Sequence, residues 1–358
     1  MFVLELGGDD DAFAAAEARA AAPDADVVAP GVATATSLDA DRFRGLAYAH
    51  RAGEHIATAD ADTAADALRG ALRDSPTDRD GTVAVRARNV RNTTDVDTQA
   101  AERELGGVLV DAGFEVDLDD PDHELRALFS AAPRAAESAS SEGRGPSDRS
   151  SEPRAEESCF LAWLAAESVR DYGDRKPTDR PFFQPGSMDP LLARAVCNLA
   201  RVEAGDRVLD PMCGTGGVLV EAGLLGARPV GTDAQAKMVR GARQNLDHFL
   251  DDFEVARADA TRLPLGDDDE HSSSGRQAKP VDAAVFDAPY GRQSKIATHD
   301  LADLVGGALS EVRRVADRCV LVADRDWRDE ADAAGWTVES RFERRVHRSL
   351  VRYVLVLS

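Results

Sequence analysis

Four residues at the end of a predicted strand could polarise an amine. They are Asp287, Ala288, Pro289 and Tyr290, and they follow the apolar run VDAAVF. The exocyclic amine of a base is a poor nucleophile because its lone pair is conjugated into the ring. The Asp287 carboxylate and the Ala288 carbonyl can accept its two N–H hydrogens, and Tyr290 can stack on the base, a contact worth about 1–3 kcal/mol. Pro289 stiffens the turn. We take these four as candidate catalytic residues.

A glycine-rich loop predicts the site of a second ligand. In VLDPMCGTGGVLVEA, residues 208–222, a strand ends at Asp210 and a helix begins near Gly217. Gly214 and Gly216 permit a tight turn and the close approach of a ligand. Such folds bind ligands at the carboxyl edge of a parallel sheet. The glycine spacing does not match GxGxxG, and no Gly-Lys-Ser/Thr follows, so neither a dinucleotide fingerprint nor a Walker loop is indicated.

Three aspartates follow three consecutive predicted strands. Asp210, at the mouth of the loop, suits a cationic ligand such as the ammonium of S-adenosylmethionine and is wrong for a pyrophosphate. Asp233 is placed to accept hydrogen bonds from ribose hydroxyls. Asp259 is placed to accept from the adenine N6 amine, with Ala260 and Leu263 flanking the ring. Each alone could be a helix N-cap or a solvated carboxylate. Together they favour S-adenosylmethionine as the cofactor.

These motifs carry a family resemblance. The loop and its aspartates resemble the cofactor site of class I methyltransferases, and residues 287–290 resemble the (Asn/Asp)-Pro-Pro-Tyr motif of amino-methyltransferases that act on base amines. The competing interpretation of residues 287–290 is an edge turn. Ala288 stands where the motif has Pro; its carbonyl is available, but its φ is not fixed. We therefore expect Ala288→Pro to leave activity unchanged or to raise it modestly.

The segment RKPTDRPFFQPGSMDPLLARAVCNLA, residues 175–200, resembles the one before the core of tRNA guanine-N2 methyltransferases that carry a THUMP domain. The competing interpretation is a linker and an entry helix with Pro190 in its first turn. The resemblance places part of this segment beside the methionine end of the cofactor. With the loop motifs, the predicted cofactor-binding residues are Phe183, Gln184, Pro185, Ser187, Met188, Asp210, Pro211, Cys213, Gly214, Thr215, Gly216, Asp233, Ala234, Asp259, Ala260 and Asp287.

The elements that must position these residues alternate. Residues 189–358 run helix, strand, helix, strand, which predicts a Rossmann-like, mostly parallel sheet wrapped by helices. The final stretch ERRVHRSLVRYVLVLS, residues 343–358, reads as two strands with no helix between them. The sheet should therefore end in an antiparallel C-terminal hairpin.

The N-terminal half is also mixed α/β. The spacing predicts helices at residues 12–22, 62–72 and 98–112, and strands over residues 2–6, at Val27 and over residues 82–90, 114–118 and 125–130. Residues 88–129 resemble a THUMP domain, the module that grips the tRNA acceptor stem in the family, and the first 45 or so resemble the ferredoxin-like domain that precedes it. The predicted domains are ferredoxin-like 1–45, THUMP 46–170, a linker 171–190 and a methyltransferase domain 191–358.

Two polar stretches interrupt these elements. Residues 133–158 are Ser, Glu, Arg, Pro and Gly with almost nothing apolar, so they cannot bury enough surface to offset the entropy of ordering, and a disordered insertion is predicted. Residues 266–280 form a shorter polar loop.

Charge says little about partners here. The chain has 65 acidic and 43 basic residues, a net charge of −22, and lysine only at positions 176, 237, 279 and 295. This composition resembles proteins of salt-loving archaea, and at molar salt the Debye length is about 3 Å, so the net charge does not exclude RNA binding. The acidic N-terminus is no secretory signal, and no apolar run is long enough for a membrane span, so we expect a cytoplasmic protein. Four cysteines without metal spacing predict no metal.

The resemblance covers nearly the whole chain and fits the archaeal tRNA guanine-10 N2-dimethyltransferases best. It implies mono- and then dimethylation of guanosine N2, with tRNA as partner and a monomer as the expected state. Asp287 and the following Gly291 and Arg292 favour this family over guanine-6 enzymes. The alternatives are another THUMP-type enzyme for guanine-6 of tRNA or for rRNA, and a non-catalytic RNA-binding relative, which Ala288 would support. A DNA adenine methyltransferase would need a target-recognition domain that the sequence does not indicate.

Overall fold

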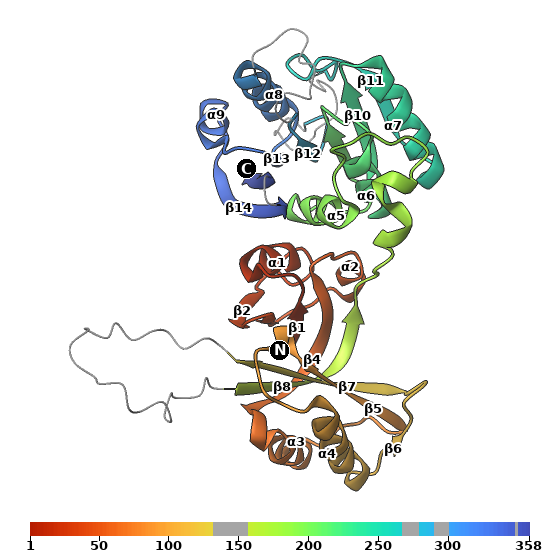
Figure 1. The fold of residues 1–358 in the computed structure, drawn as a ribbon, viewed down its shortest axis with the longest axis vertical. Helices are drawn as coiled ribbons and strands as arrows, with labels where there is room; N and C mark the ends of the chain where they lie inside the picture. Colours follow the sequence, from red (N-terminus) through yellow and green to blue (C-terminus); the bar gives the residue numbers. More distant parts are fainter. Residues whose placement is uncertain (132–156, 267–278, 290–300, 348–349) are drawn as a thin grey trace, which may run out of the picture. The chain divides into compact units, whose positions relative to one another are not determined.

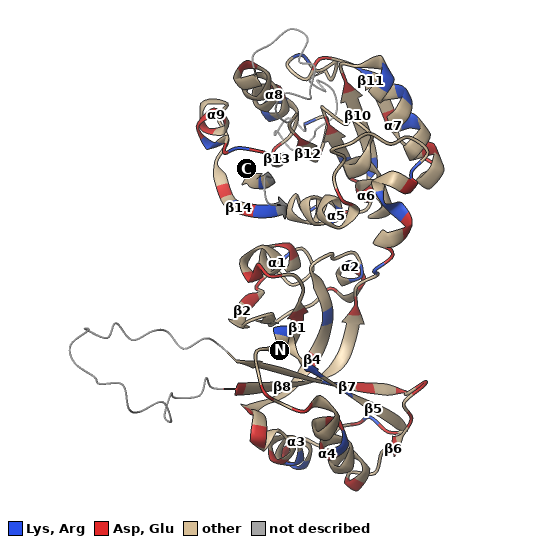
Figure 2. Cartoon of the chain, in the orientation of Figure 1, with Lys and Arg blue, Asp and Glu red and all other residues tan. Residues whose placement is uncertain are grey.

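The computed structural model describes residues 1–131, 157–266, 279–289, 301–347 and 350–358, without the side chains of residues 346, 347 and 350. Residues 1–44 and 48–168 form one compact unit, and residues 45–47 and 169–358 form the other (Figure 1). Acidic and basic residues are distributed over both units (Figure 2). Among the described residues, no helix combines the length and the apolar character that crossing a membrane requires.

The N-terminal unit is built on one eight-stranded sheet in the order β2-β3-β1-β4-β8-β7-β5-β6. β4 pairs with β1 on one side and with β8 on the other, so the sheet continues past residue 45. The division of this half into two domains at that residue stays a prediction. The strands are β1 (Phe2–Leu6), β2 (Asp26–Ala29), β3 (Val32–Ala35), β4 (Ala49–Asp60), β5 (Thr82–Asn89), β6 (Glu115–Val116), β7 (His123–Ala131) and β8 (Glu157–Glu167), and the helices are α1 (Asp11–Ala18), α2 (Ala40–Phe43), α3 (Ala64–Asp74) and α4 (Thr98–Asp111).

The predicted elements of this unit are present, with shifted ends, but three strands and a short helix, β3, β4, β8 and α2, are additional. The C-terminal boundary predicted for the disordered insertion was wrong, because Glu157 and Ser158 begin β8. They pair with Ala131 and Ser130 of β7, because a backbone ladder can extend through polar residues once the neighbouring strand is in place. The rest of that stretch, residues 133–156, lies outside the described residues.

The C-terminal unit has a seven-stranded sheet in the order β11-β10-β9-β12-β13-β15-β14. β9, β10, β11, β12 and β13 are parallel, and β15 is antiparallel to both of its neighbours, as the sequence predicts. The strands are β9 (Arg207–Asp210), β10 (Arg228–Asp233), β11 (Glu254–Arg257), β12 (Ala283–Asp287), β13 (Cys319–Ala323), β14 (Val338–His347) and β15 (Leu350–Leu357), and the helices are α5 (Pro190–Leu199), α6 (Gly217–Leu224), α7 (Ala236–Phe249), α8 (Leu301–Val315) and α9 (Arg328–Ala333).

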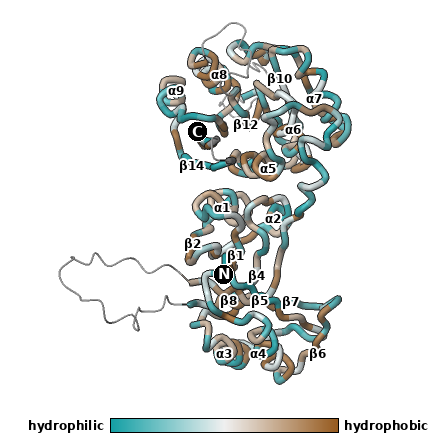
Figure 3. Tube along the Cα trace, viewed as in Figure 1, coloured by the Kyte–Doolittle hydropathy of each residue, from teal (hydrophilic) through white to brown (hydrophobic). Residues whose placement is uncertain are grey.

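Apolar packing fixes the carboxyl edge of this sheet. Hydrophobic residues run along α5 and α8 (Figure 3). Phe286, the penultimate residue of β12, is fully buried in a cluster with Leu309 of α8 and Leu321 of β13. α6 packs against α5 on one side and α7 on the other. The residues that follow β9, β10 and β12 therefore start from rigid positions.

A buried ion cluster holds the segment before α5 against α6. Glu221 of α6 is fully buried, and its Oε1 accepts from Arg175 Nε at 2.8 Å. Arg194 of α5 lies 2.9 Å from Oε2, and Arg175 also pairs with Asp171 at 2.9 Å. The sequence gives no sign of this cluster, because Glu221 lies in an apolar helix and its partners are far along the chain. It joins the segment before α5 and α5 itself to α6, the helix that follows the glycine-rich loop.

We predict that Glu221→Ala lowers the free energy of unfolding by about 3–5 kcal/mol, because it removes the buried carboxylate that Arg175 and Arg194 share and leaves Arg175 only the exposed Asp171. The matched control is Glu254→Ala, which removes an exposed carboxylate 3.3 Å from Arg207 and should cost less than about 1 kcal/mol. Urea unfolding curves of the two variants at one salt concentration measure the difference. Equal losses would show that the Glu221 cluster does not hold this region.

Candidate active site

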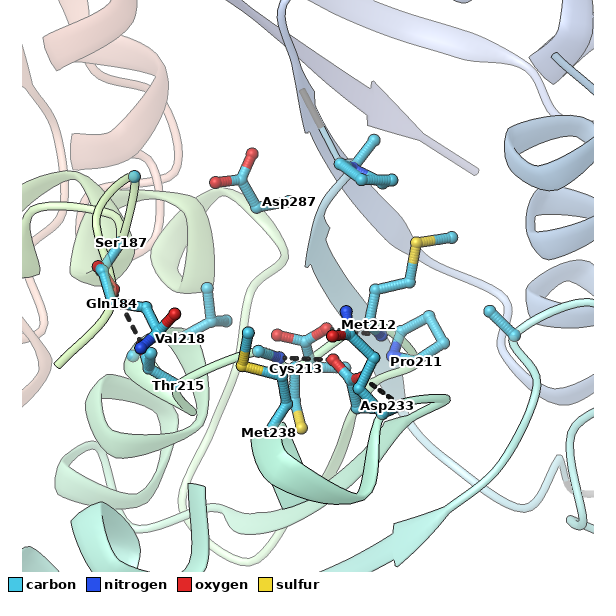
Figure 4. Close-up of a pocket in the computed structure, with 18 of the residues that line it drawn as sticks. Gln184, Ser187, Pro211, Met212, Cys213, Thr215, Val218, Asp233, Met238 and Asp287 are labelled. Atoms are coloured by element: carbon cyan, nitrogen blue, oxygen red, sulfur yellow. Dashed lines mark hydrogen bonds between the residues drawn. The ribbon is translucent and has the colours of Figure 1, made fainter. Parts of the chain in front are cut away.

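A cavity of about 350 Å³ lies at the carboxyl edge of the C-terminal sheet. The ends of β9, β10 and β12 and the residues after β11 contribute to it, together with the segment before α5 (Figure 4). Its lining consists of Gln184, Pro185, Gly186, Ser187, Met188, Asp210, Pro211, Met212, Cys213, Gly214, Thr215, Gly217, Val218, Asp233, Ala234, Gln235, Met238, Asp259, Ala260, Asp287, Ala288, Pro289 and Leu304.

The segment before α5 is fastened to the loop by a buried amide. Asn245 of α7 accepts from the Phe182 N–H at 2.8 Å and donates to the carbonyls of Phe182 and Thr215 at 2.9 and 2.8 Å. The Phe182 ring lies where a side chain on Gly241 would be, since a Cβ there would come within 2.0 Å of it. Ser187 Oγ lies 3.1 Å from Thr215 Oγ1. These contacts bring residues 184–188 to the cavity as its wall.

The glycine-rich loop is shaped by backbone hydrogen bonds to two of the aspartates. Gly214 and Gly216 have φ values of 52° and 78°, in the left-handed region that favours glycine. The Asp210 carboxylate accepts from the Met212 N–H at 3.0 Å. The Asp233 carboxylate accepts from the Gly214 N–H at 3.1 Å and from the Gln235 N–H at 2.8 Å. Asp233 therefore ties the start of α7 to the loop while it lines the cavity.

The described charged side chains that line the cavity are all acidic. Four carboxylates line it, from Asp210, Asp233, Asp259 and Asp287, and none of its lining residues within the described ranges is Lys or Arg. Burial raises the pKa of Asp210 well above its usual range, and the charges of Asp287 and Asp233 raise it further. Burial also raises the pKa of Asp233, against the hydrogen bonds from Gln235 and Gly214. Such a cavity fits a cationic ligand and disfavours the pyrophosphate of NAD or the triphosphate of ATP.

Asp259 differs from the other carboxylates because it is exposed. Its Oδ1 accepts from the Thr261 N–H at 2.9 Å and from the Thr261 hydroxyl at 2.8 Å, a short turn after β11. Ala260 is buried beside it and lines the cavity. Leu263 is buried but is not among the lining residues.

The predicted catalytic motif begins where β12 ends. The Asp287 side chain is 19% exposed, and its Oδ1 atom is buried with no hydrogen-bond partner in the described part of the chain. Burial raises the pKa of Asp287 to about 8; the Arg352 charge opposes this rise and the Asp324 charge adds to it. Ala288 and Pro289 also line the cavity, whereas Tyr290, with Gly291 and Arg292, lies outside the described residues.

Most of the predicted cofactor residues therefore meet at one cavity, with two exceptions. Phe183 is 43% exposed and is not a lining residue. Gly216 is the N-cap residue of α6 and is not a lining residue either. The lining residues that the sequence did not single out fall in two groups. Some lie within motifs already recognised, and the others come from two helices, Gln235 and Met238 from the start of α7 and Leu304 from α8, which no local pattern connects to the site. The former are Gly186, Met212, Gly217 and Val218.

Comparison with known proteins places the chain in a family. Residues 177–354 match the family model described as RMKL-like, methyltransferase domain. The tRNA (guanine(10)-N2)-dimethyltransferase of Methanothermobacter thermautotrophicus is 35% identical over 323 residues, which cover 87% of this chain and 83% of that protein. The chain belongs to the tRNA (guanine(10)-N2)-dimethyltransferase family. The protein of that name from Pyrococcus abyssi is 35% identical over 192 residues, 52% of this chain and 55% of that protein.

The predicted family is thus confirmed, and with it the class I methyltransferase domain, whose cofactor is S-adenosylmethionine. Among solved structures, TrmN from Thermus thermophilus is 22% identical, with a TM-score of 0.48, and the match covers 100% of this chain and 99% of that one.

The structure revises the expectation for Ala288→Pro. The Ala288 N–H donates to the Val322 carbonyl at 2.8 Å, at the end of the β12–β13 ladder. Proline has no N–H to donate. We now predict that Ala288→Pro lowers the free energy of unfolding by about 1 kcal/mol and does not raise activity. Thermal unfolding and initial methylation rates test this, and an unchanged melting temperature with a higher rate would contradict it.

The carboxylate-lined cavity predicts selective binding of the cofactor. Calorimetry should detect S-adenosylmethionine binding, and Asp233→Ala should abolish it, because the variant loses both a polar contact of the cavity and two hydrogen bonds that shape the loop. NAD and ATP should not bind. Asp251→Ala, at an exposed position after α7, is the control that should bind normally. Binding of NAD or ATP in preference to S-adenosylmethionine would contradict the electrostatic argument.

Proposed function

We propose that this protein methylates the exocyclic N2 amine of guanosine at position 10 of tRNA, first once and then a second time. The observation that carries the proposal is the Asp287 carboxylate, which lines a cavity with three other carboxylates and keeps one buried oxygen without a partner in the described structure. The names of the relatives from Methanothermobacter thermautotrophicus and Pyrococcus abyssi support the choice of tRNA and of this nucleoside.

The cavity offers groups that match each part of S-adenosylmethionine. Asp210 provides a buried carboxylate for the ammonium or the sulfonium, and Asp233 provides one for the ribose hydroxyls. Asp259 and Ala260 provide an acceptor and an apolar surface for the adenine. The wall residues Gln184, Pro185, Ser187 and Met188 border the same space. The cofactor, when bound, supplies a methyl group activated by its positively charged sulfur.

Asp287 prepares the amine for attack. We assign to its Oδ1 the acceptance of one N–H hydrogen of the guanine amine, and to the Ala288 carbonyl the acceptance of the other. The two acceptors turn the amine so that its lone pair is no longer conjugated with the ring. Tyr290 stays the proposed stacking platform, and Pro289 borders the cavity next to it. The acceptor role favours the ionised form of Asp287, because protonation turns one carboxyl oxygen into a donor and weakens the other as an acceptor.

The removal of this acceptor tests the proposed function. We predict that Asp287→Ala lowers the methylation rate by at least about 10²–10³, the usual cost of a preorganised electrostatic contact, with S-adenosylmethionine affinity near normal. Asp282→Ala, at the exposed position immediately before β12, is the matched control. Single-turnover methylation of a tRNA transcript measures both. If Asp287→Ala keeps more than about a tenth of the wild-type rate, the motif is not the catalytic centre.

Burial of Asp287 also predicts the pH dependence of the reaction. Because burial raises the pKa of Asp287 to about 8, the carboxyl of the free enzyme is protonated below that pH and ionised above it. We therefore expect kcat/KM to rise with pH through a midpoint near 8. A rate that is constant from pH 6 to pH 9 would contradict the assigned role of Asp287.

We assign tRNA docking to the N-terminal unit, as a THUMP-type module that grips the acceptor stem. The resemblance of residues 88–129 to THUMP domains supports this assignment. We also propose a monomeric, cytoplasmic protein, and the acidic, lysine-poor composition supports a salt-loving archaeon as its source. At high salt, tRNA affinity would depend on shape and short-range contacts more than on net charge.

Truncation tests the docking role. A chain that begins at Val169 should bind S-adenosylmethionine but should not methylate tRNA, because it lacks the unit assigned to docking. Cofactor binding is the control for folding, since the truncation also removes the Gly45 carbonyl to which Asn198 donates at 3.0 Å. Deletion of residues 136–155 should leave methylation nearly unchanged because that polar stretch has little to pack. Full activity of the truncated chain would contradict the assignment.

A further inference from the structure

A buried arginine lies beside the predicted catalytic carboxylate. Arg352 of β15 is 4% exposed, and its Nη2 atom lies 3.8 Å from Asp287 Oδ2. β13 separates β15 from β12 in the sheet, and Ala323, the last residue of β13, is level with Tyr353 of β15. Because β15 is antiparallel to β13, Arg352 comes one residue beyond that pair, at the carboxyl edge where β12 also ends. The C-terminal hairpin thus delivers a cation to the edge that carries the motif.

The two oxygens of Asp287 have different surroundings. Oδ2 lies toward Arg352, whereas Oδ1 is buried and has no hydrogen-bond partner among the described residues. An ionised carboxylate can accept at both oxygens, so a charge at Oδ2 leaves Oδ1 available to a substrate. One oxygen of Asp287, Oδ2, therefore faces a cation, and the other, Oδ1, is available to accept a hydrogen bond.

The surroundings of Asp287 favour its protonated form, and Arg352 opposes that effect. Asp324, which follows β13, acts on Asp287 as a negative neighbour and raises its pKa. Arg352 is the cation that opposes this effect in the described part of the site. Burial and this like charge favour the protonated carboxyl, and a protonated carboxyl is a weaker acceptor for an N–H hydrogen than a carboxylate.

We propose that Arg352 is a positioning residue for methyl transfer. Its guanidinium favours the ionised form of Asp287 and faces Oδ2, so that Oδ1 accepts an N–H hydrogen of the base amine. This inference deepens the proposed function and rests on it, because it assigns no chemistry to Arg352 apart from its action on Asp287.

The test compares pH profiles of single-turnover methylation for wild type, Arg352→Met, Arg352→Lys and Arg341→Met. An opposite charge at this distance shifts a carboxyl pKa by about one to three. Arg352→Met should therefore raise the midpoint of the profile by about one pH unit or more, with a rate at pH 7 about ten-fold lower or worse that recovers at high pH. Arg352→Lys keeps the charge and should stay near the wild-type midpoint. Arg341, on β14, pairs with Asp326 and Glu343, so its replacement should not move the midpoint.

An equal loss of rate at every pH, with an unchanged midpoint, would overturn the proposal and leave Arg352 a structural role only. Thermal unfolding at pH 9 gives a readout that needs no turnover. There the double variant Asp287→Asn with Arg352→Met should melt at a higher temperature than Arg352→Met alone, because it no longer buries an uncompensated carboxylate. A double variant that is no more stable than Arg352→Met alone would also overturn the proposed interaction between Arg352 and Asp287. A wild-type protein that does not methylate tRNA would refute the proposed function, while this unfolding comparison still tests the pair.

Discussion

The site depends on one electrostatic constraint: carboxylates are kept out of water at the edge of a sheet, in a cavity whose described lining contains no cation. Burying ionised carboxylates is costly, and the raised pKa values of Asp210, Asp233 and Asp287 express that cost. A ligand that brings positive charge relieves it. The same constraint disfavours phosphate-bearing cofactors, so the fold selects its cofactor class by charge as well as by shape.

The parallel sheet brings this concentration of charge about. Strands β9, β10 and β12 end at one edge, and a carboxylate ends each of them. The opposite wall has no strand behind it, so hydrogen bonds must hold it. Asn245 ties Phe182 to the loop, and Glu221 binds Arg175 and Arg194 beneath the same region. The interior of this unit therefore uses ion pairs and amide contacts to fix a surface that apolar packing alone would leave loose.

Local patterns in the sequence predicted the parts of the site that follow directly from strand ends. Asp210, Asp233 and Asp287 could be placed because each terminates an apolar run, and the antiparallel hairpin could be placed because two strands follow each other without a helix. β4 escaped prediction because its residues, AHRAGEHIATAD, show no long apolar run; its ladder partners on both sides, β1 and β8, make it a strand.

Contacts between distant segments could not be predicted. Arg352 reaches Asp287 only because an antiparallel strand returns past β13, and Glu221 meets its arginines only after α5 and α6 pack. Leu304 enters the cavity from α8 in the same way. Each depends on the register or packing of elements that are far apart in sequence, which no local spacing encodes. The expectation for Ala288→Pro changed for the same reason, since the hydrogen bond to Val322 is a cross-strand contact.

The central claim is that a cationic methyl donor and a guanine amine meet at Asp287. Its most direct test is mass spectrometry of an unmodified tRNA transcript after incubation with the protein and S-adenosylmethionine labelled in the methyl group, with a second transcript that carries adenosine at position 10. The account predicts labelled N2-methylguanosine and then N2,N2-dimethylguanosine at position 10 of the first transcript and no label in the second. Label on another nucleoside, or equal labelling of both transcripts, would contradict it.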